Sequence, residues 1–179
     1  MKLAISGDIG SGKSTLCKIL SEELGFPIVS IGKLNREKAE SLNMSISDFS
    51  NYMLSHPEIE EEFDNAQKAY ENSDENVIID SRLGFHFVPS AISIYLKVST
   101  YDAALRIFKE KREKEKYETK ADCMIAIDSR AKSERQRYWN KYRVDIQDEL
   151  NYDFIISTAD KTPEEIAQKI IRLVRKTQR

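Results

Sequence analysis

Short apolar runs alternate with amphipathic stretches along most of the chain. Five of the runs predict β-strands, at residues 3–6, 28–31, 77–80, 91–98 and 154–157. The stretches between them repeat apolar side chains every three or four residues, as in Leu16, Ile19 and Leu20, which predicts helices packed by one face. The pattern therefore predicts strands and helices that alternate regularly along the chain.

Residues that typically begin helices refine this pattern. Ser47 is expected to cap the helix over 45–54, Pro57 to open the next helix, and Thr162 with Glu165 to form a capping box for the last one. A long helix is expected from about residue 119 to 142. Trp139, on the side of that helix opposite Arg130, is expected to pack in the core.

The alternation of strands and helices predicts an α/β fold with a mainly parallel sheet. No repeat or long linker interrupts it, so we expect one domain covering residues 1–179. Right-handed crossovers between parallel strands would place a ligand crevice at the carboxyl ends of the strands.

Composition narrows the class of protein. Of 179 residues, 40% are hydrophobic and 32% charged, and the formal net charge is −2, which argues against broad electrostatic binding of DNA or RNA. No apolar run approaches the roughly 18 residues of a membrane span, and Cys17 and Cys123 lack partners at metal-binding spacing. We expect a cytoplasmic monomer that binds a small anionic ligand, with no nucleic-acid or membrane partner.

One motif carries specific chemistry. Residues 7–14, GDIGSGKS, match the phosphate-loop pattern G-x-x-x-x-G-K-S and lie between a predicted strand and a predicted helix. Inward backbone N–H groups and the helix N-terminus bind phosphates in such loops, the lysine follows the transferred phosphoryl group, and the serine contacts Mg²⁺. The expected ATP-binding residues are Gly7, Asp8, Ile9, Gly10, Ser11, Gly12, Lys13, Ser14 and Thr15.

Polar residues at the end of one strand extend this site. Asp80 ends the apolar run VIID, where an acid can join Ser14 near Mg²⁺, although capping of the following loop would also explain it. Arg82 follows directly and is expected in the crevice.

Charged residues also recur on the long helix. Arg130, Glu134 and Arg137 lie on one stripe, which suits either a surface ion-pair ladder or recognition of a phosphorylated ligand. No NKxD-like guanine motif occurs, which argues against a GTPase.

Taken together, the segments VSIGKLNRE, SDFSNYMLSHPEIEEEFDNAQ, IDSRLGFHFVP, SRAKSERQRYWNKYRVDIQDELNYDFIIST and TPEEIAQKI follow the phosphate loop in a characteristic order. In this order and spacing the chain resembles the cytidylate kinases, particularly the short archaeal-type members of the nucleoside monophosphate kinase group. The resemblance implies a five-stranded parallel sheet, an acceptor-binding helical segment over about 32–72 and a lid over about 106–121.

The resemblance also implies roles for single residues. Arg36 and Arg82 would hold the phosphate of CMP or dCMP, and Arg130, Glu134 and Arg137 would contact phosphate, ribose and cytosine. Lys13 and Arg82, with Arg106 and Arg112 of the lid, would stabilise the transferred phosphoryl group.

Two departures from the family pattern leave the acceptor open. Ser81 stands where many members have glycine, and Lys33 where an acidic or small residue is frequent. The alternatives are a kinase of UMP, AMP or a small hydroxylated metabolite, and a non-catalytic ATP-binding regulatory protein.

Overall fold

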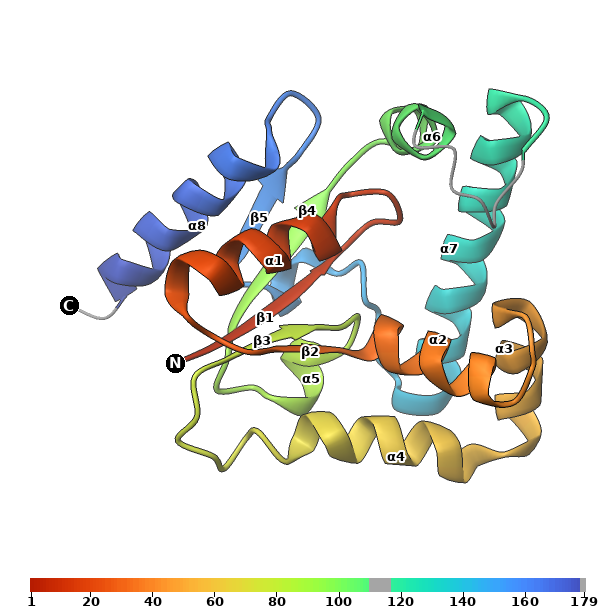
Figure 1. Cartoon of the computed structure of the whole chain (residues 1–179), viewed down its shortest axis with the longest axis horizontal. Coiled ribbons are helices and arrows are strands. Elements are labelled where there is room, and N and C mark those ends of the chain that lie inside the picture. Colours follow the sequence, from red (N-terminus) through yellow and green to blue (C-terminus); the bar gives the residue numbers. More distant parts are fainter. Residues whose placement is uncertain (110–116, 178–179) are drawn as a thin grey trace.

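The computed structural model describes residues 1–109 and 117–177. Its centre is one sheet of five strands in the order β2-β3-β1-β4-β5, and each neighbouring pair runs parallel (Figure 1). The predicted α/β class with a five-stranded parallel sheet is therefore confirmed. The strands are β1 (Lys2–Gly7), β2 (Ile28–Ser30), β3 (Val77–Asp80), β4 (Ile92–Lys97) and β5 (Phe154–Ser157).

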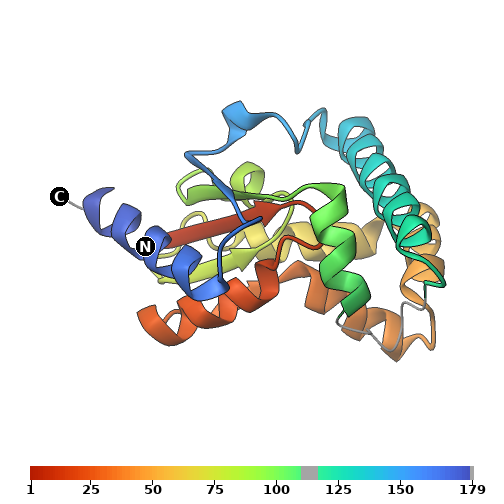
Figure 2. The ribbon, with the colours of Figure 1, turned by 90° about the horizontal axis from the view of Figure 1, so that it is seen from above.

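Helices cover both faces of the sheet, and α6 and α7 lie beyond the strand ends where the phosphate loop turns back (Figure 2). The α-helices among the described residues are α1 (Lys13–Leu24), α2 (Ile31–Ser41), α3 (Ile46–Ser55), α4 (Pro57–Lys68), α5 (Gly84–Phe87), α6 (Thr100–Lys109), α7 (Lys120–Tyr142) and α8 (Pro163–Thr177). A short 3₁₀ helix, η1 (Glu149–Asn151), precedes β5. Within the described ranges, no helix is both long and apolar enough to cross a membrane.

The core divides between the two faces because successive strand side chains point to opposite sides. Leu3 and Ile5 of β1 pack with α1 and α8 on one face, in a cluster that includes Leu20 and Ile170. Ala4, between them in sequence, packs on the other face with the residues around α5. Both faces of the parallel sheet are thus buried, which explains the near-continuous apolar strands.

Two smaller apolar clusters lie outside the sheet core. One joins α2, α3 and α4 around Phe49 and Phe63, over the region expected to bind the acceptor. The other joins α6 to α7 around Ile107 and Cys123. Each group of helices therefore has an apolar cluster of its own.

Part of the expected lid, residues 110–116 with Arg112, lies outside the described residues.

Two local expectations are wrong. Helix α3 begins at Ile46 and is capped by Ser45, whose hydroxyl accepts the Asp48 N–H at 3.1 Å, so Ser47 is not the cap. Trp139 is 46% exposed, because the side of α7 opposite Arg130 faces solvent at that point.

The core predicts a stability difference between two isoleucines. Ile94 in β4 is fully buried, so Ile94→Ala should lower the free energy of unfolding by about 2–5 kcal/mol through lost burial and a cavity. Ile155→Ala in β5, where the side chain is 36% exposed, is the matched control and should cost clearly less. Urea denaturation measures both, and equal losses would contradict this account of the core.

Candidate phosphate-transfer site

The phosphate loop, residues 7–14, leaves central strand β1 and enters α1. Gly7 has φ 147°, and a Cβ there would lie 2.4 Å from the Leu96 carbonyl oxygen of β4. Gly10 has φ 75°, and a Cβ there would lie 2.8 Å from Cβ of Ala103 in α6. Both positions require glycine because a Cβ would clash with β4 or α6 and because side chains disfavour these positive φ angles.

Asp8 fixes this loop to the sheet. Its carboxylate accepts the Tyr95 hydroxyl at 2.5 Å and the Val98 N–H at 2.8 Å, both from the β4 side. Since the Asp8 side chain is engaged there, its contribution to phosphate binding would come from the backbone N–H.

Lys13 lies at the centre of the loop. Its Nζ donates to the carbonyl oxygens of Gly7 at 2.9 Å and Asp8 at 3.0 Å. Burial, followed by the positive charge of Arg82, lowers the pKa of Lys13 to about 7. Ser11 Oγ, in the same loop, is buried without a hydrogen-bond partner in the described part of the chain. A bound phosphate anion would offset the repulsion between Lys13 and Arg82 and would accept a hydrogen bond from the Ser11 hydroxyl.

Asp80 and two hydroxyl groups form an oxygen-rich group beside the loop. Ser14 Oγ lies 3.5 Å from Asp80 Oδ2, and Ser30 Oγ donates to the same oxygen at 2.9 Å. Mg²⁺ prefers oxygen ligands and commonly uses one or two carboxylates together with substrate phosphates, so this donor set fits it. The sequence did not predict Ser30 as a member of this site. Its position between the end of β2 and the start of α2 could have indicated it, because ligands bind at the carboxyl ends of parallel strands.

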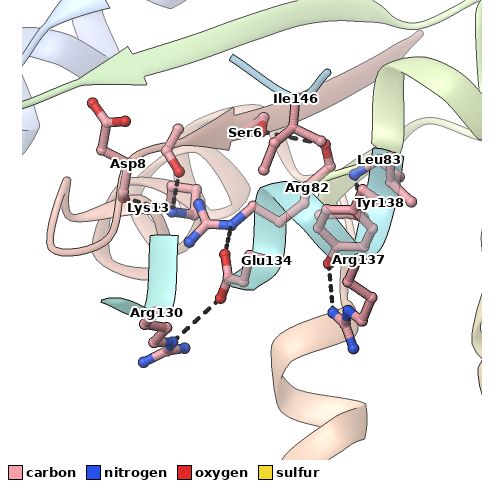
Figure 3. A network of polar contacts seen from close by, with 12 residues as sticks. Ser6, Asp8, Lys13, Arg82, Leu83, Arg130, Glu134, Arg137, Tyr138 and Ile146 are labelled. Carbon is pink, nitrogen blue, oxygen red and sulfur yellow. Dashed lines mark hydrogen bonds and ion pairs between the residues drawn. The ribbon is translucent and has the colours of Figure 1, made fainter. Parts of the chain in front are cut away.

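Arg82, Glu134 and Arg130 form one network between the end of β3 and α7 (Figure 3). Arg82 Nε donates to Glu134 Oε2 at 2.9 Å, and Arg130 Nε donates to Glu134 Oε1 at 3.2 Å. Burial alone would raise the pKa of Glu134, but Arg82 and then Arg130 outweigh it and lower that pKa. Arg82 Nη1 is buried without a hydrogen-bond partner among the described residues, beside Lys13.

Arg137 continues this face of α7. Its Nη2 donates to the Tyr138 hydroxyl at 3.0 Å (Figure 3). Its Nη1 lies 4.0 Å from Oε1 of Glu60 in α4. Glu60 Oε2 also accepts Lys141 Nζ at 2.7 Å. The predicted stripe of Arg130, Glu134 and Arg137 is thus part of a wider network, and sequence reasoning missed Glu60 and Tyr138.

The remaining predicted arginines lie elsewhere. Arg36 is exposed on α2 beside Gly32, and no contact among the described residues joins it to the Arg82–Glu134 network. Arg106 of α6 donates to Thr158 Oγ1 at 3.0 Å, to the carbonyl oxygens of Thr158 and Ala159, and to that of Gly10 at 3.4 Å. It bridges the phosphate loop to the segment after β5, and its action on the phosphoryl group stays a prediction, as does that of Arg112.

Comparison with known proteins places this chain in a family. The chain matches the AAA domain family over residues 3–140. It is 36% identical over 171 residues to the cytidylate kinase of Thermoplasma acidophilum, covering 93% of this chain and 88% of that enzyme. It is 38% identical over 177 residues to an S-adenosylmethionine-dependent nucleotide dehydratase of Lacinutrix mariniflava, covering 98% of this chain. The chain spans only 36% of the length of that dehydratase.

A solved structure agrees on the fold. Shikimate kinase from Bacteroides thetaiotaomicron superposes with a TM-score of 0.62 at 15% identity, covering 98% of each chain. The chain belongs to the P-loop nucleoside monophosphate kinase family. Membership implies ATP as the phosphoryl donor.

The lowered pKa of Lys13 predicts proton uptake on nucleotide binding. With a free pKa of about 7, Lys13 is mostly neutral at pH 8, and a bound polyphosphate anion raises that pKa. Binding of ADP at pH 8 should therefore take up about one proton, and affinity should fall by up to about tenfold per pH unit above pH 7. Calorimetry in buffers of different ionisation enthalpy measures the uptake.

Lys13→Arg provides the control, because arginine stays protonated at these pH values. A variant that still binds ADP should lose this uptake. Equal uptake by the two proteins would assign the proton to another group.

Proposed function

We propose that this protein transfers the γ-phosphoryl group of Mg·ATP to CMP or dCMP, forming the diphosphate. The observation that carries the proposal is the buried Arg82 guanidinium, whose Nη1 has no partner among the described residues and which lies beside the buried Lys13. Two adjacent buried cations are stabilised when anions occupy the space between them. Phosphoryl transfer between nucleotides would bring the phosphates of the donor and of the acceptor to the space between Lys13 and Arg82.

The residues divide the work between donor and acceptor. The phosphate loop with Lys13 would hold the β- and γ-phosphates of ATP, and Ser14 with Asp80 would hold Mg²⁺, which neutralises charge on those phosphates when bound. Arg82, Arg130 and Arg137 would hold the acceptor phosphate, joined by Arg36 if α2 moves inward. Glu134 would orient Arg82 and Arg130. Little covalent chemistry is needed, so positioning and electrostatics suffice.

The charge of the site and the relatives both support a nucleotide as the acceptor. Arg82, Arg130 and Arg137, gathered along one face of α7, suit an acceptor that carries a phosphate better than an uncharged hydroxylated metabolite. The cytidylate kinase relative matches over most of both chains, and the name of the dehydratase relative also refers to a nucleotide. The shikimate kinase likeness concerns the fold alone.

Release of ADP from Mg·ATP tests the activity directly. We expect strong turnover with CMP or dCMP, weaker turnover with UMP, AMP and GMP, and little without an acceptor. Lys13→Ala should abolish the acceptor-dependent turnover because the γ-phosphoryl group loses its mobile cation. If turnover is fastest with UMP or AMP, that nucleotide takes the place of CMP as the acceptor in this proposal. Background hydrolysis alone, together with tight ATP binding, would favour a regulatory protein.

Arg137 gives a finer test of the acceptor site. Arg137→Ala should lower kcat/KM for CMP by about 10- to 100-fold, because one charge-assisted contact to the acceptor phosphate is lost. ATP hydrolysis without an acceptor should change little. Lys132→Ala, which removes an exposed cation from the same helix, is the matched control. Equal loss of both activities in Arg137→Ala would contradict an acceptor role.

A further inference from the structure

The guanidinium of Arg137 contacts the next residue along α7, Tyr138, in two ways. Arg137 Nη2 donates to the Tyr138 hydroxyl at 3.0 Å, and the guanidinium carbon lies 4.8 Å from the centroid of the Tyr138 ring (Figure 3). Successive side chains of a helix point about 100° apart and do not normally face each other. The Arg137 side chain must therefore bend over its neighbour, so the two contacts together select one conformation of a long side chain.

Tyr138 is itself fixed to the core of the sheet. Its ring packs against the apolar cluster that contains Ala4 and Ile79, and its centroid lies 6.3 Å from that of the Tyr142 ring. Burial raises the pKa of Tyr138, so the hydroxyl is neutral near pH 7 and can accept a hydrogen bond from a guanidinium. The sheet core thus determines where the hydroxyl that holds Arg137 lies.

Most of the Arg137 guanidinium is left for a ligand. The Arg137 side chain is 30% exposed, and its Nη1 lies 4.0 Å from Glu60 Oε1, which is beyond hydrogen-bond distance. Within the described part of the chain, the bond to Tyr138 is the one hydrogen bond that this guanidinium makes. Since a guanidinium carries five N–H donors, several remain for the oxygens of an anion.

An arginine that is already oriented binds a phosphate at a lower entropic cost. A mobile arginine side chain loses rotamer freedom when it binds a ligand, and that loss weakens binding. The hydrogen bond and the ring contact with Tyr138 impose much of this order before a ligand arrives. Without the hydroxyl, the charge of Arg137 would stay in place but its direction would be less defined.

Resting on the proposed function, we infer that Tyr138 is a positioning residue that orients Arg137 toward the phosphate of the acceptor nucleotide. Tyr138 acts through Arg137 and needs no contact with the nucleotide itself. The contribution of Arg137 to acceptor binding then depends on the Tyr138 hydroxyl, whereas binding of ATP at the phosphate loop does not.

Tyr138→Phe tests the inference because it removes the hydroxyl and keeps the ring that packs on the sheet. KM for CMP should rise by about 3- to 10-fold, since one hydrogen bond to a charged group is lost. KM for ATP and the melting temperature should stay unchanged. Tyr70→Phe is the matched control, because the Tyr70 ring packs against the same cluster and its hydroxyl makes no hydrogen bond among the described residues. It should leave both KM values unchanged.

A double-mutant cycle separates positioning from direct binding. In an Arg137→Ala background, Tyr138→Phe should cause no further loss of kcat/KM for CMP, because the residue through which Tyr138 acts is gone. An equal loss in both backgrounds would overturn the inference and make Tyr138 a ligand of the nucleotide.

Three other results would also count against the inference. An unchanged KM for CMP in Tyr138→Phe would overturn it directly. A lower melting temperature, with KM for CMP and ATP raised alike, would assign the hydroxyl to stability alone. Failure of the unaltered protein to phosphorylate any nucleoside monophosphate, measured before any variant, would overturn the proposed function and the inference with it.

Discussion

The burial of Lys13 beside Arg82 is the constraint on which the site depends. Two like charges lie close together away from water, so the free energy of the empty site includes a repulsion that Asp80 and Glu134 only partly offset. The carbonyl oxygens of Gly7 and Asp8 hold the ammonium group, and Glu134 holds the guanidinium. A cationic site that is already assembled spares an anionic ligand much of the cost of organising it.

The sheet supplies the rigidity that this arrangement needs. The phosphate loop leaves β1, the central strand, which is hydrogen-bonded to β3 on one side and β4 on the other. Asp8 ties the loop to β4, while Asp80 and Arg82 come from the end of β3. The two neighbours of β1 therefore place the loop and its partners against each other through backbone pairing, which deforms little.

Much of this architecture could be predicted from sequence because its signals are local. The strands, the phosphate loop, the start of the long helix near residue 119, the Thr162–Glu165 capping box and the Arg130 stripe all depend on nearby residues. Contacts between distant segments could not be predicted: Glu60 meets Arg137, and Ser30 meets Asp80, only after folding. The cap at Ser45 and the exposure of Trp139 were missed because neighbouring serines compete and because helical spacing does not reveal which face meets solvent.

The separate apolar clusters of α2–α4 and of α6–α7 have a consequence for how such proteins diverge. These helices have apolar clusters of their own around Phe49 and Ile107, while Tyr138 and Tyr142 of α7 also pack against the core of the sheet. Substitutions within the separate clusters therefore perturb the central core little. Natural selection can then alter the groups that meet the acceptor while the loop that handles the donor is preserved. A single ancestral scaffold can thereby give rise to enzymes for many different acceptors.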